Sequence, residues 1–221
     1  MWRATPLAAA AVLSLCGCSS TREQTYRPFF ALISESVKSS FSRTMVTRNQ
    51  AAAVPYASMG WSIGHNPERM IILATDNNGE QIWTSGDHVV LTLRDGRIVR
   101  TVGLPDNLAA NAPHGGGDDL GPAAAVEGPF SSLRTADYTQ SKLFSVALSC
   151  RTATRGRETI VILGAKISTV RVSERCSSAQ LAWSFENTYW VSSNSKLVWR
   201  SIQYISPKMD PIETRMLRPH D

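Results

Sequence analysis

From residue 56 onward, apolar and polar residues alternate in short stretches, and this period of two is typical of β-strands with one buried face. In the first stretch, Ala57, Met59, Trp61 and Ile63 alternate with polar or small residues. Turn sequences such as Asp95-Gly96 separate the stretches and favour hairpins. We expect about ten strands, at 56–64, 70–75, 81–84, 89–93, 98–102, 142–151, 158–163, 167–172, 188–192, 196–205 and 212–217, with an irregular one at 179–186.

One segment near the N-terminus has the period of a helix instead. After Pro28, apolar residues recur at spacings of three and four, at Phe29, Phe30, Ile33, Val37 and Phe41. This pattern predicts an amphipathic helix of three to four turns that packs against the sheet. With no βαβ unit in the pattern, the expected fold is mainly β, an antiparallel meander curled into an open or flattened barrel with an N-terminal helix against it.

Residues 105–129 interrupt the alternation with four prolines, three consecutive glycines at 115–117, and Asp118-Asp119. They predict a long loop, in which residues 123–126 favour one turn of helix. The glycines and carboxylates from His114 to Asp119 suit a calcium ion or the hydroxyl groups of a glycan. A solvated turn is the simpler interpretation, because the ligand spacing of an EF-hand is missing, and no metal site is predicted.

The first eighteen residues have the layout of a bacterial lipoprotein signal. Arg3 precedes an apolar run from Leu7 to Leu15, which is shorter than the ~20 residues that a permanent membrane helix needs. The run ends like a lipobox, and cleavage before Cys18 places Leu15 at −3 and Gly17 at −1. Cys18 is therefore the predicted lipidation site, carrying acyl chains such as palmitate. An ordinary signal peptide and an uncleaved anchor stay open as alternatives.

This assignment divides the chain into a signal peptide (1–17), a lipidated tether (18–27) and a single β-rich domain (28–221). By the sorting rules of bacterial lipoproteins, Ser19 in place of an aspartate predicts the outer membrane, with the domain facing the periplasm. The formal net charge of +5 comes from scattered basic residues rather than an aromatic-interleaved patch, so no nucleic-acid partner is expected.

If the signal is removed and Cys18 is lipidated, two of the four cysteines remain, Cys150 and Cys176. In an oxidising compartment they are expected to form a disulfide, although two buried free thiols would fit the same sequence. A redox or zinc site is not expected, because there is no C-x-x-C motif and the four histidines lie far apart in sequence. No cofactor is predicted.

Residues 60–64, Gly-Trp-Ser-Ile-Gly, match the G-x-S-x-G motif of serine hydrolases. In those enzymes the serine lies on a sharp turn from strand to helix, but here the alternation of a strand continues through Ser62. Pro67 follows with no amphipathic helix in between, and His65 is too close in sequence to be the usual downstream base. We therefore expect a non-catalytic strand residue and no catalytic site.

Five tryptophans remain after the signal: Trp61, Trp83, Trp183, Trp190 and Trp199. Aromatic rings stack on sugars but also fill barrel interiors, and packing in the core is the commoner role on strands. Those that lie at the barrel rim are candidate glycan contacts. The candidates are Trp61, Trp190 and Trp199, together with Asp118 and Asp119 of the glycine-rich loop.

Several stretches taken together resemble a known family. They are the signal ending at Cys18, residues 55–59 (PYASM), residues 96–104 (GRIVRTVGL) with Asp106-Asn107-Leu108, and the C-terminal segments 189–191 and 200–204. In this order and spacing they resemble the YjbF/GfcB-like group 4 capsule polysaccharide lipoproteins. The resemblance implies an outer-membrane lipoprotein, with an open β-barrel around a helix, that acts with partners in secretion of a capsule or exopolysaccharide. It supplies no catalytic residues, and it includes neither Cys150 and Cys176 nor the glycine-rich loop.

The hypothesis from the sequence is a non-enzymatic accessory factor that contacts the polysaccharide, the export proteins, or both. One alternative is an envelope serine hydrolase that uses Ser62. Another is a half-barrel carrier of lipid or lipoprotein. The carrier needs a continuous apolar cavity, whereas the export hypothesis predicts a filled interior and an exposed contact surface.

Overall fold

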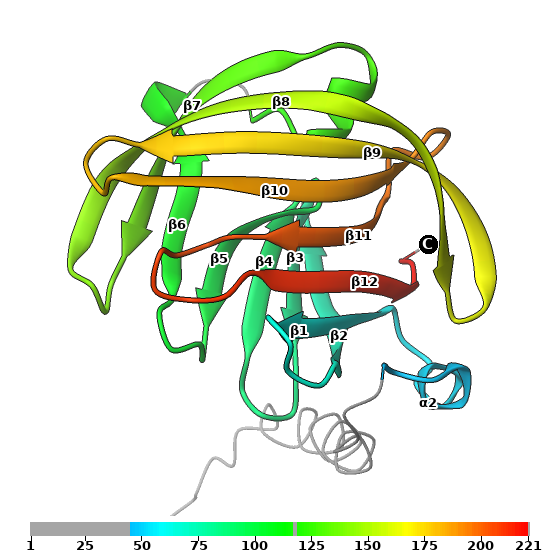
Figure 1. Ribbon diagram of the computed structural model, residues 1–221. Coiled ribbons are helices and arrows are strands. Elements are labelled where there is room, and N and C mark those ends of the chain that lie inside the picture. Colours follow the sequence, from blue (N-terminus) through cyan, green and yellow to red (C-terminus); the bar gives the residue numbers. More distant parts are fainter. Residues whose placement is uncertain (1–44, 117–118, 221) are drawn as a thin grey trace, which may run out of the picture.

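The computed structural model describes residues 45–116 and 119–220, which form one antiparallel sheet of twelve strands (Figure 1). The strands are β1 (Ser58–Ile63), β2 (Arg69–Asn77), β3 (Glu80–Thr84), β4 (Val90–Arg94), β5 (Arg97–Val102), β6 (Leu108–Pro113), β7 (Phe130–Tyr138), β8 (Leu143–Ile162), β9 (Ala165–Ser178), β10 (Trp183–Ser192), β11 (Val198–Gln203) and β12 (Ile212–Arg218).

Two meanders make up the sheet, β1 to β5 and β6 to β12, and they join where β1 pairs with β12. The edge strands β5 and β6 follow each other in the chain. Arg100 of β5 donates a hydrogen bond to the carbonyl of Ala109 in β6, and Thr101 accepts one from the backbone N–H of Leu108. The sheet is therefore a nearly closed barrel, and the predicted mainly β, curled antiparallel fold is confirmed.

The expected loop at 105–129 is wrong in one part, because residues 108–113 form β6. Of this strand only Leu108 is buried, and the others are small, polar or proline, so the sequence offers no clear alternation. Strand β7 was not predicted either. The expected turn of helix at 123–126 is confirmed as part of the 3-10 helix η2 (Pro122–Val126), and a second one, η1, spans His114–Gly116.

Strand β8 runs unbroken through twenty residues, although two shorter strands were expected. Its middle, residues 152–157, is polar and includes a β-bulge, where the register with β9 shifts between Thr154 and Gly156. Gly156 has φ of 112°, a conformation that glycine adopts without steric cost. Beyond this bulge, the β8–β9 hairpin curves over the outside of the barrel towards α2 (Arg48–Ala52), as Figure 1 shows.

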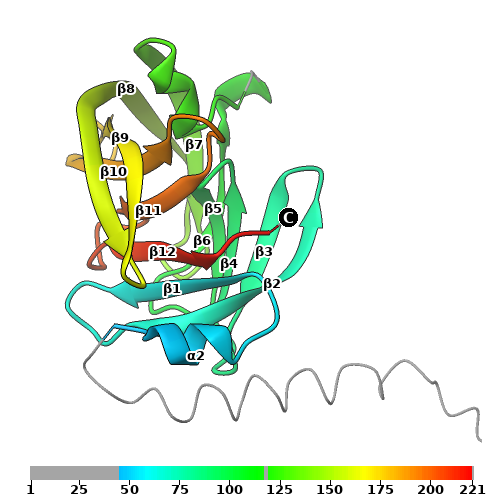
Figure 2. The ribbon, with the colours of Figure 1, turned by 90° about the vertical axis from the view of Figure 1, so that its right-hand side faces the viewer.

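A cluster of apolar residues joins the hairpin tip to the outer surface of the barrel. Ile160 and Ile162 pack in it with Val46 and Val54, which flank α2, and with Trp190 of β10. The helix is short and begins at a capping box, in which Thr47 and Gln50 bond to each other's backbone N–H groups. Figure 2 shows α2 beside β1 and β2.

The barrel interior holds the main apolar core, which includes Trp61, Trp83, Leu91 and Tyr138. A smaller apolar cluster forms where Ala123 and Ala125 of η2 pack against Val172, Tyr189 and Val191. The helix predicted at 28–41, the tether and Cys18 lie outside the described residues. None of the helices that the structure describes has the length and apolar character of a membrane span.

Cys150 and Cys176 face each other in the register of β8 and β9, with their Cα atoms 4.1 Å apart, and they form a disulfide. Both are buried in the main core. The bond links residues 26 positions apart. It therefore limits the freedom of the unfolded chain across the β8–β9 hairpin.

Replacing both cysteines, as in Cys150→Ala/Cys176→Ala, is expected to lower the free energy of unfolding by about 3 kcal/mol, because the unfolded chain regains its loop entropy. Denaturant unfolding of the oxidised proteins measures the difference. Reductant should destabilise the wild type and leave the double variant unchanged. A wild-type midpoint that is insensitive to reductant, under conditions in which free thiols appear, would contradict this account.

Candidate functional site

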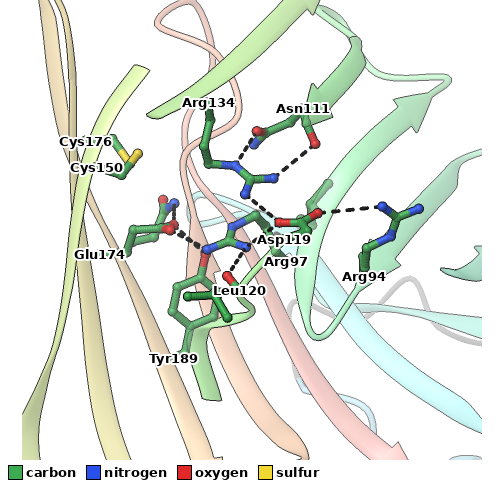
Figure 3. A network of polar contacts seen from close by, with 12 residues as sticks. Arg94, Arg97, Asn111, Asp119, Leu120, Arg134, Cys150, Glu174, Cys176 and Tyr189 are labelled. Atoms are coloured by element: carbon green, nitrogen blue, oxygen red, sulfur yellow. Dashed lines mark hydrogen bonds and ion pairs between the residues drawn. A yellow bond between two sulfur atoms is a disulfide. The ribbon is translucent and has the colours of Figure 1, made fainter. Parts of the chain in front are cut away.

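A network of charged side chains crosses the barrel interior (Figure 3). At its centre, the Arg97 guanidinium of β5 donates a hydrogen bond of 2.5 Å to the Glu174 carboxylate of β9. Each side chain is at most 3% exposed. Glu174 also accepts hydrogen bonds of 3.0 Å from the amide of Asn187 and the hydroxyl of Tyr189, both on β10. The pair thus links the two meanders across the barrel.

Asp119, from the loop after η1, extends the network to a third part of the sheet. One of its carboxylate oxygens lies 2.6 Å from Nη1 of Arg134 on β7 and 3.4 Å from Nη1 of Arg97, and the other lies 3.7 Å from Nη1 of Arg94. Arg134 also donates to the side chain and carbonyl of Asn111 on β6. A carboxylate held by three arginines has little capacity left for a sugar or a calcium ion.

A second branch of the network reaches β11 and β12 through Gln203. Its side-chain carbonyl accepts a hydrogen bond from the backbone N–H of Ile98 and shares the single hydroxyl proton of Tyr189 with Glu174, and its amide donates to the carbonyl of Gly96. Ser201 continues the branch to Thr214. These polar side chains therefore form a connected path from β5 to β12, although the Nε of Arg97 is buried without a hydrogen-bond partner among the described residues.

The charges in this network depend on one another. Burial by itself would raise the pKa of Glu174, but the charge of Arg97 and the hydrogen bonds from Arg97, Asn187 and Tyr189 outweigh it and hold the pKa below its usual value. Burial and the neighbouring Glu174 charge raise the pKa of Tyr189 well above that of a free tyrosine. At neutral pH, Glu174 is thus an anion and Tyr189 a neutral donor.

Little space remains around this network. The pocket that Arg134, Glu174, Asn187 and the disulfide line has a volume of about 10 Å³, which is roughly the room for one water molecule. Cys150, Cys176 and Glu174 bring three metal-ligating atoms within 4.8 Å of one another. Both sulfurs are used in the disulfide, so this group has no thiolate to offer a metal.

The serine of the G-x-S-x-G motif lies on a strand, as expected. β1 continues through Ser62, which pairs with Glu213 of β12, and the chain then turns into β2. A pocket of about 190 Å³ beside Ser62 is lined by Trp61, Ser62, Ile63, Asn66, Pro67, Arg69, Val89, Gly103, Leu104 and Pro105. This lining contains neither a histidine nor a carboxylate, so it lacks the base that a serine nucleophile needs.

Both glycines of the motif have structural roles. Gly60 leaves room for the Glu68 carboxylate, which a Cβ at that position would overlap, and buried Glu68 forms an ion pair with Arg215. Gly64 has φ of 53° and begins the turn after β1. The backbone and a buried ion pair therefore explain the G-x-S-x-G pattern without catalysis.

The tryptophans named as candidate glycan contacts are mostly buried. Trp61 and Trp190 are 4% and 6% exposed, and Arg200 lies 4.5 Å above the ring of Trp190. Trp199 is half-buried and packs against two core clusters. Of the two loop candidates, Asp119 is in the interior network, and Asp118 lies outside the described residues.

Sequence reasoning missed a partly exposed aromatic group. Trp183 stacks on Phe185 with their ring centroids 4.0 Å apart, and Tyr204 lies 6.2 Å from Phe185. The apolar spacing of residues 181, 183 and 185 was a usable signal for it. The outer side of β9 and β10 has a further feature, an open hollow of about 400 Å³ lined by Arg175, Cys176, Ser177, Ser184, Phe185 and Glu186.

Comparison with known proteins assigns this barrel to a family. Residues 29–217 match the sequence profile of the group 4 capsule polysaccharide lipoprotein family (GfcB, YjbF). The chain belongs to this family. Within it, the chain is 26% identical to the lipoprotein GfcB of Escherichia coli K12, over 94% of each chain. It is 28% identical to the lipoprotein YjbF of the same organism, over 78% of this chain and 80% of YjbF.

The barrel also has a counterpart among solved structures. The crystal structure of the hypothetical lipoprotein YmcC from Escherichia coli K12 superposes with a TM-score of 0.69 and 22% sequence identity, covering 93% of this chain and all of that one. At this identity the similarity establishes the fold. The resemblance to group 4 capsule lipoproteins that was read from the sequence is confirmed.

Glu174→Gln is expected to lower the free energy of unfolding at pH 7 by about 3–5 kcal/mol, because it leaves the Arg97 charge buried with a weaker partner. Denaturant unfolding measures this loss. The matched control is Glu186→Gln on the outer face, where the partly exposed pair with Arg175 is worth at most ~1 kcal/mol. If the two substitutions lowered the free energy of unfolding equally, the interior pair would contribute no more to stability than the exposed one.

The same carboxylate makes stability sensitive to acid. Since the pKa of Glu174 is lower in the folded protein than in the unfolded chain, its contribution is complete above the unfolded-state pKa and is lost as the pH falls through the folded-state pKa. Unfolding free energies measured from about pH 7 to pH 3 should therefore decline more steeply for the wild type than for Glu174→Gln. Parallel curves would be inconsistent with the assignment.

Proposed function

We propose that this group 4 capsule lipoprotein is a non-enzymatic accessory factor in the secretion of a capsule or exopolysaccharide. The observation that carries the proposal is the filled, ion-paired interior of the barrel. Charged side chains span the position where a carrier would hold its ligand, and the pocket among them has a volume of only about 10 Å³. The protein therefore acts through its outer surface, on the polysaccharide, on export proteins, or on both.

The hydrolase alternative lacks support at Ser62. Its strand is followed by a turn into β2, and the pocket beside it has neither a histidine nor a carboxylate among its lining residues. In residues 45–116 and 119–220, no histidine is hydrogen-bonded to Ser62. Family membership supports the same conclusion, because the family is described as capsule lipoproteins.

Cys18 is the proposed point of attachment to the outer membrane, with the barrel facing the periplasm. The lipobox-like residues before Cys18 and the lipoprotein descriptions of GfcB and YjbF support this part of the proposal. Attachment would hold the barrel near the site where polysaccharide leaves the cell. A soluble form would be diluted through the periplasm.

Secreted polysaccharide in a strain that lacks this protein tests the proposal. The deletion should reduce secretion, and wild type and Ser62→Ala should both restore it. Cys18→Ala should fail to restore it at matched protein levels, because the barrel is then not anchored. Immunoblots of membrane and soluble fractions provide the control for expression and location.

Normal secretion in the deletion strain would refute the export role. Failure of Ser62→Ala, with the protein folded and anchored, would favour the hydrolase instead. Acyl chains that copurify with Cys18→Ala, which lacks the proposed anchor, would favour the carrier.

A further inference from the structure

The outer face of β7–β10 carries an ordered set of polar side chains, which we call the arginine face: Ser131, Ser149, Arg151, Arg155, Arg175, Ser177, Ser184 and Glu186. On β9, Glu174 and Cys176 point into the barrel, so Arg175 and Ser177 point outward. The strand register places Arg151 opposite Arg175, and Ser177 between Ser149 and Ser184. A row of arginines thus lies beside a row of serines.

The arginines on this face outnumber the carboxylates that pair with them. Arg175 donates a hydrogen bond to Glu186, and Nη2 of Arg155 lies 3.7 Å from the same carboxylate. Arg151 is exposed and has no ion-pair partner among the described residues. Like charges directly opposite each other on neighbouring strands destabilise a sheet. A bound anion between Arg151 and Arg175 would remove this repulsion.

A hollow adjoins these arginines. Arg175, Ser177, Ser184 and Glu186 are among the residues that line an open depression of about 400 Å³. The hydroxyls of Ser149, Ser177 and Ser184 make no hydrogen bonds to other described residues. The hollow therefore combines free hydroxyls, which bond to sugar hydroxyls, with guanidinium groups, which match a carboxylate.

The chemistry favours a glycan over a peptide. An extended peptide that adds to the sheet as a further strand needs a free strand edge, but at Arg151 and Arg175 the backbones of β8 and β9 are each paired on both sides. An anionic membrane surface is a weaker fit as well. From Ser149 to Arg157, the exposed side chains of β8 are serine, threonine and arginine. The large apolar side chain exposed beside them is Leu133 of β7, opposite Ser149, and by itself it offers little area to insert into lipid.

We propose that the arginine face binds an acidic polysaccharide, with uronate-type carboxylates between Arg151 and Arg175 and sugar hydroxyls on the serine row. This inference rests on the proposed function and adds its substrate class and binding surface. The face is open, as a long chain that passes across it requires. In Figure 1, the outer side of β8–β10 faces the viewer, and α2 lies beside β1 and β2, near the tip of the β8–β9 hairpin.

Binding of the full-length protein, purified in a mild detergent, to alginate tests the inference, with neutral dextran as the comparison. Arg151→Gln/Arg175→Gln should weaken alginate binding at least about tenfold, because two charge-assisted contacts are lost. Ser177→Leu should weaken it as well, since it fills the hollow without changing the charge. The matched control, Lys142→Gln/Lys166→Gln, removes the same charge from two exposed side chains next to the two ends of β8 and should change binding by at most about twofold.

Several results would overturn the inference. The first is that Arg151→Gln/Arg175→Gln binds alginate as tightly as the wild type, and the second is that the matched control loses as much alginate binding as this variant. The third is that the wild type binds dextran as tightly as alginate. The fourth is that only Trp183→Ala weakens alginate binding. An effect of the arginine substitutions on phosphatidylglycerol nanodiscs but not on alginate would assign the face to lipid. If alginate binding fails these tests but the deletion strain secretes less polysaccharide, only this inference is refuted. If the deletion strain secretes polysaccharide normally, the proposed function is refuted.

Discussion

The ion pair between Arg97 and Glu174 is the contact on which the closed form of this barrel depends. A barrel of about eight strands is filled by apolar side chains alone, and a wider one leaves a lumen. This sheet has twelve strands among the described residues, so it must flatten or fill its interior with something larger. Arg97 and Glu174 reach across the lumen from β5 and β9, and Asp119 adds a second connection through its ion pair with Arg134.

Filling a lumen with charge limits what the barrel can do. Removing a buried charge from water is costly, so each member of the network needs its partners in place. Tyr189, Asn187 and Gln203 supply hydrogen bonds around the central pair. An interior of this kind fixes the relative positions of the strands, and it leaves little room for a ligand around the network. The outer side of β8–β10 is then of interest because its arginines are exposed and only partly neutralised.

The two sides of one strand illustrate this division. On β9, Glu174 and Cys176 serve the interior, one in the charge network and one in the disulfide, while Arg175 between them faces solvent. The G-x-S-x-G segment is likewise determined by a buried ion pair. Gly60 is small because Glu68 lies against it, and Glu68 in turn pairs with Arg215. A glycine of the hydrolase-like motif is therefore explained by the space that a buried ion pair needs.

The sequence by itself determined the class of fold, most of the hairpins and the family, and it favoured the pairing of Cys150 with Cys176, which the structure then confirmed. These features depend on local alternation, on turn residues such as Asp95-Gly96, and on the number of cysteines left for pairing. The tertiary structure decided the rest. Strand β6 forms because its backbone pairs with β7, although its own residues show little alternation, and Asp119 is in the interior rather than on an open loop. Charged partners 77 residues apart, such as Arg97 and Glu174, are brought together only by closure of the sheet, and no local pattern records that contact.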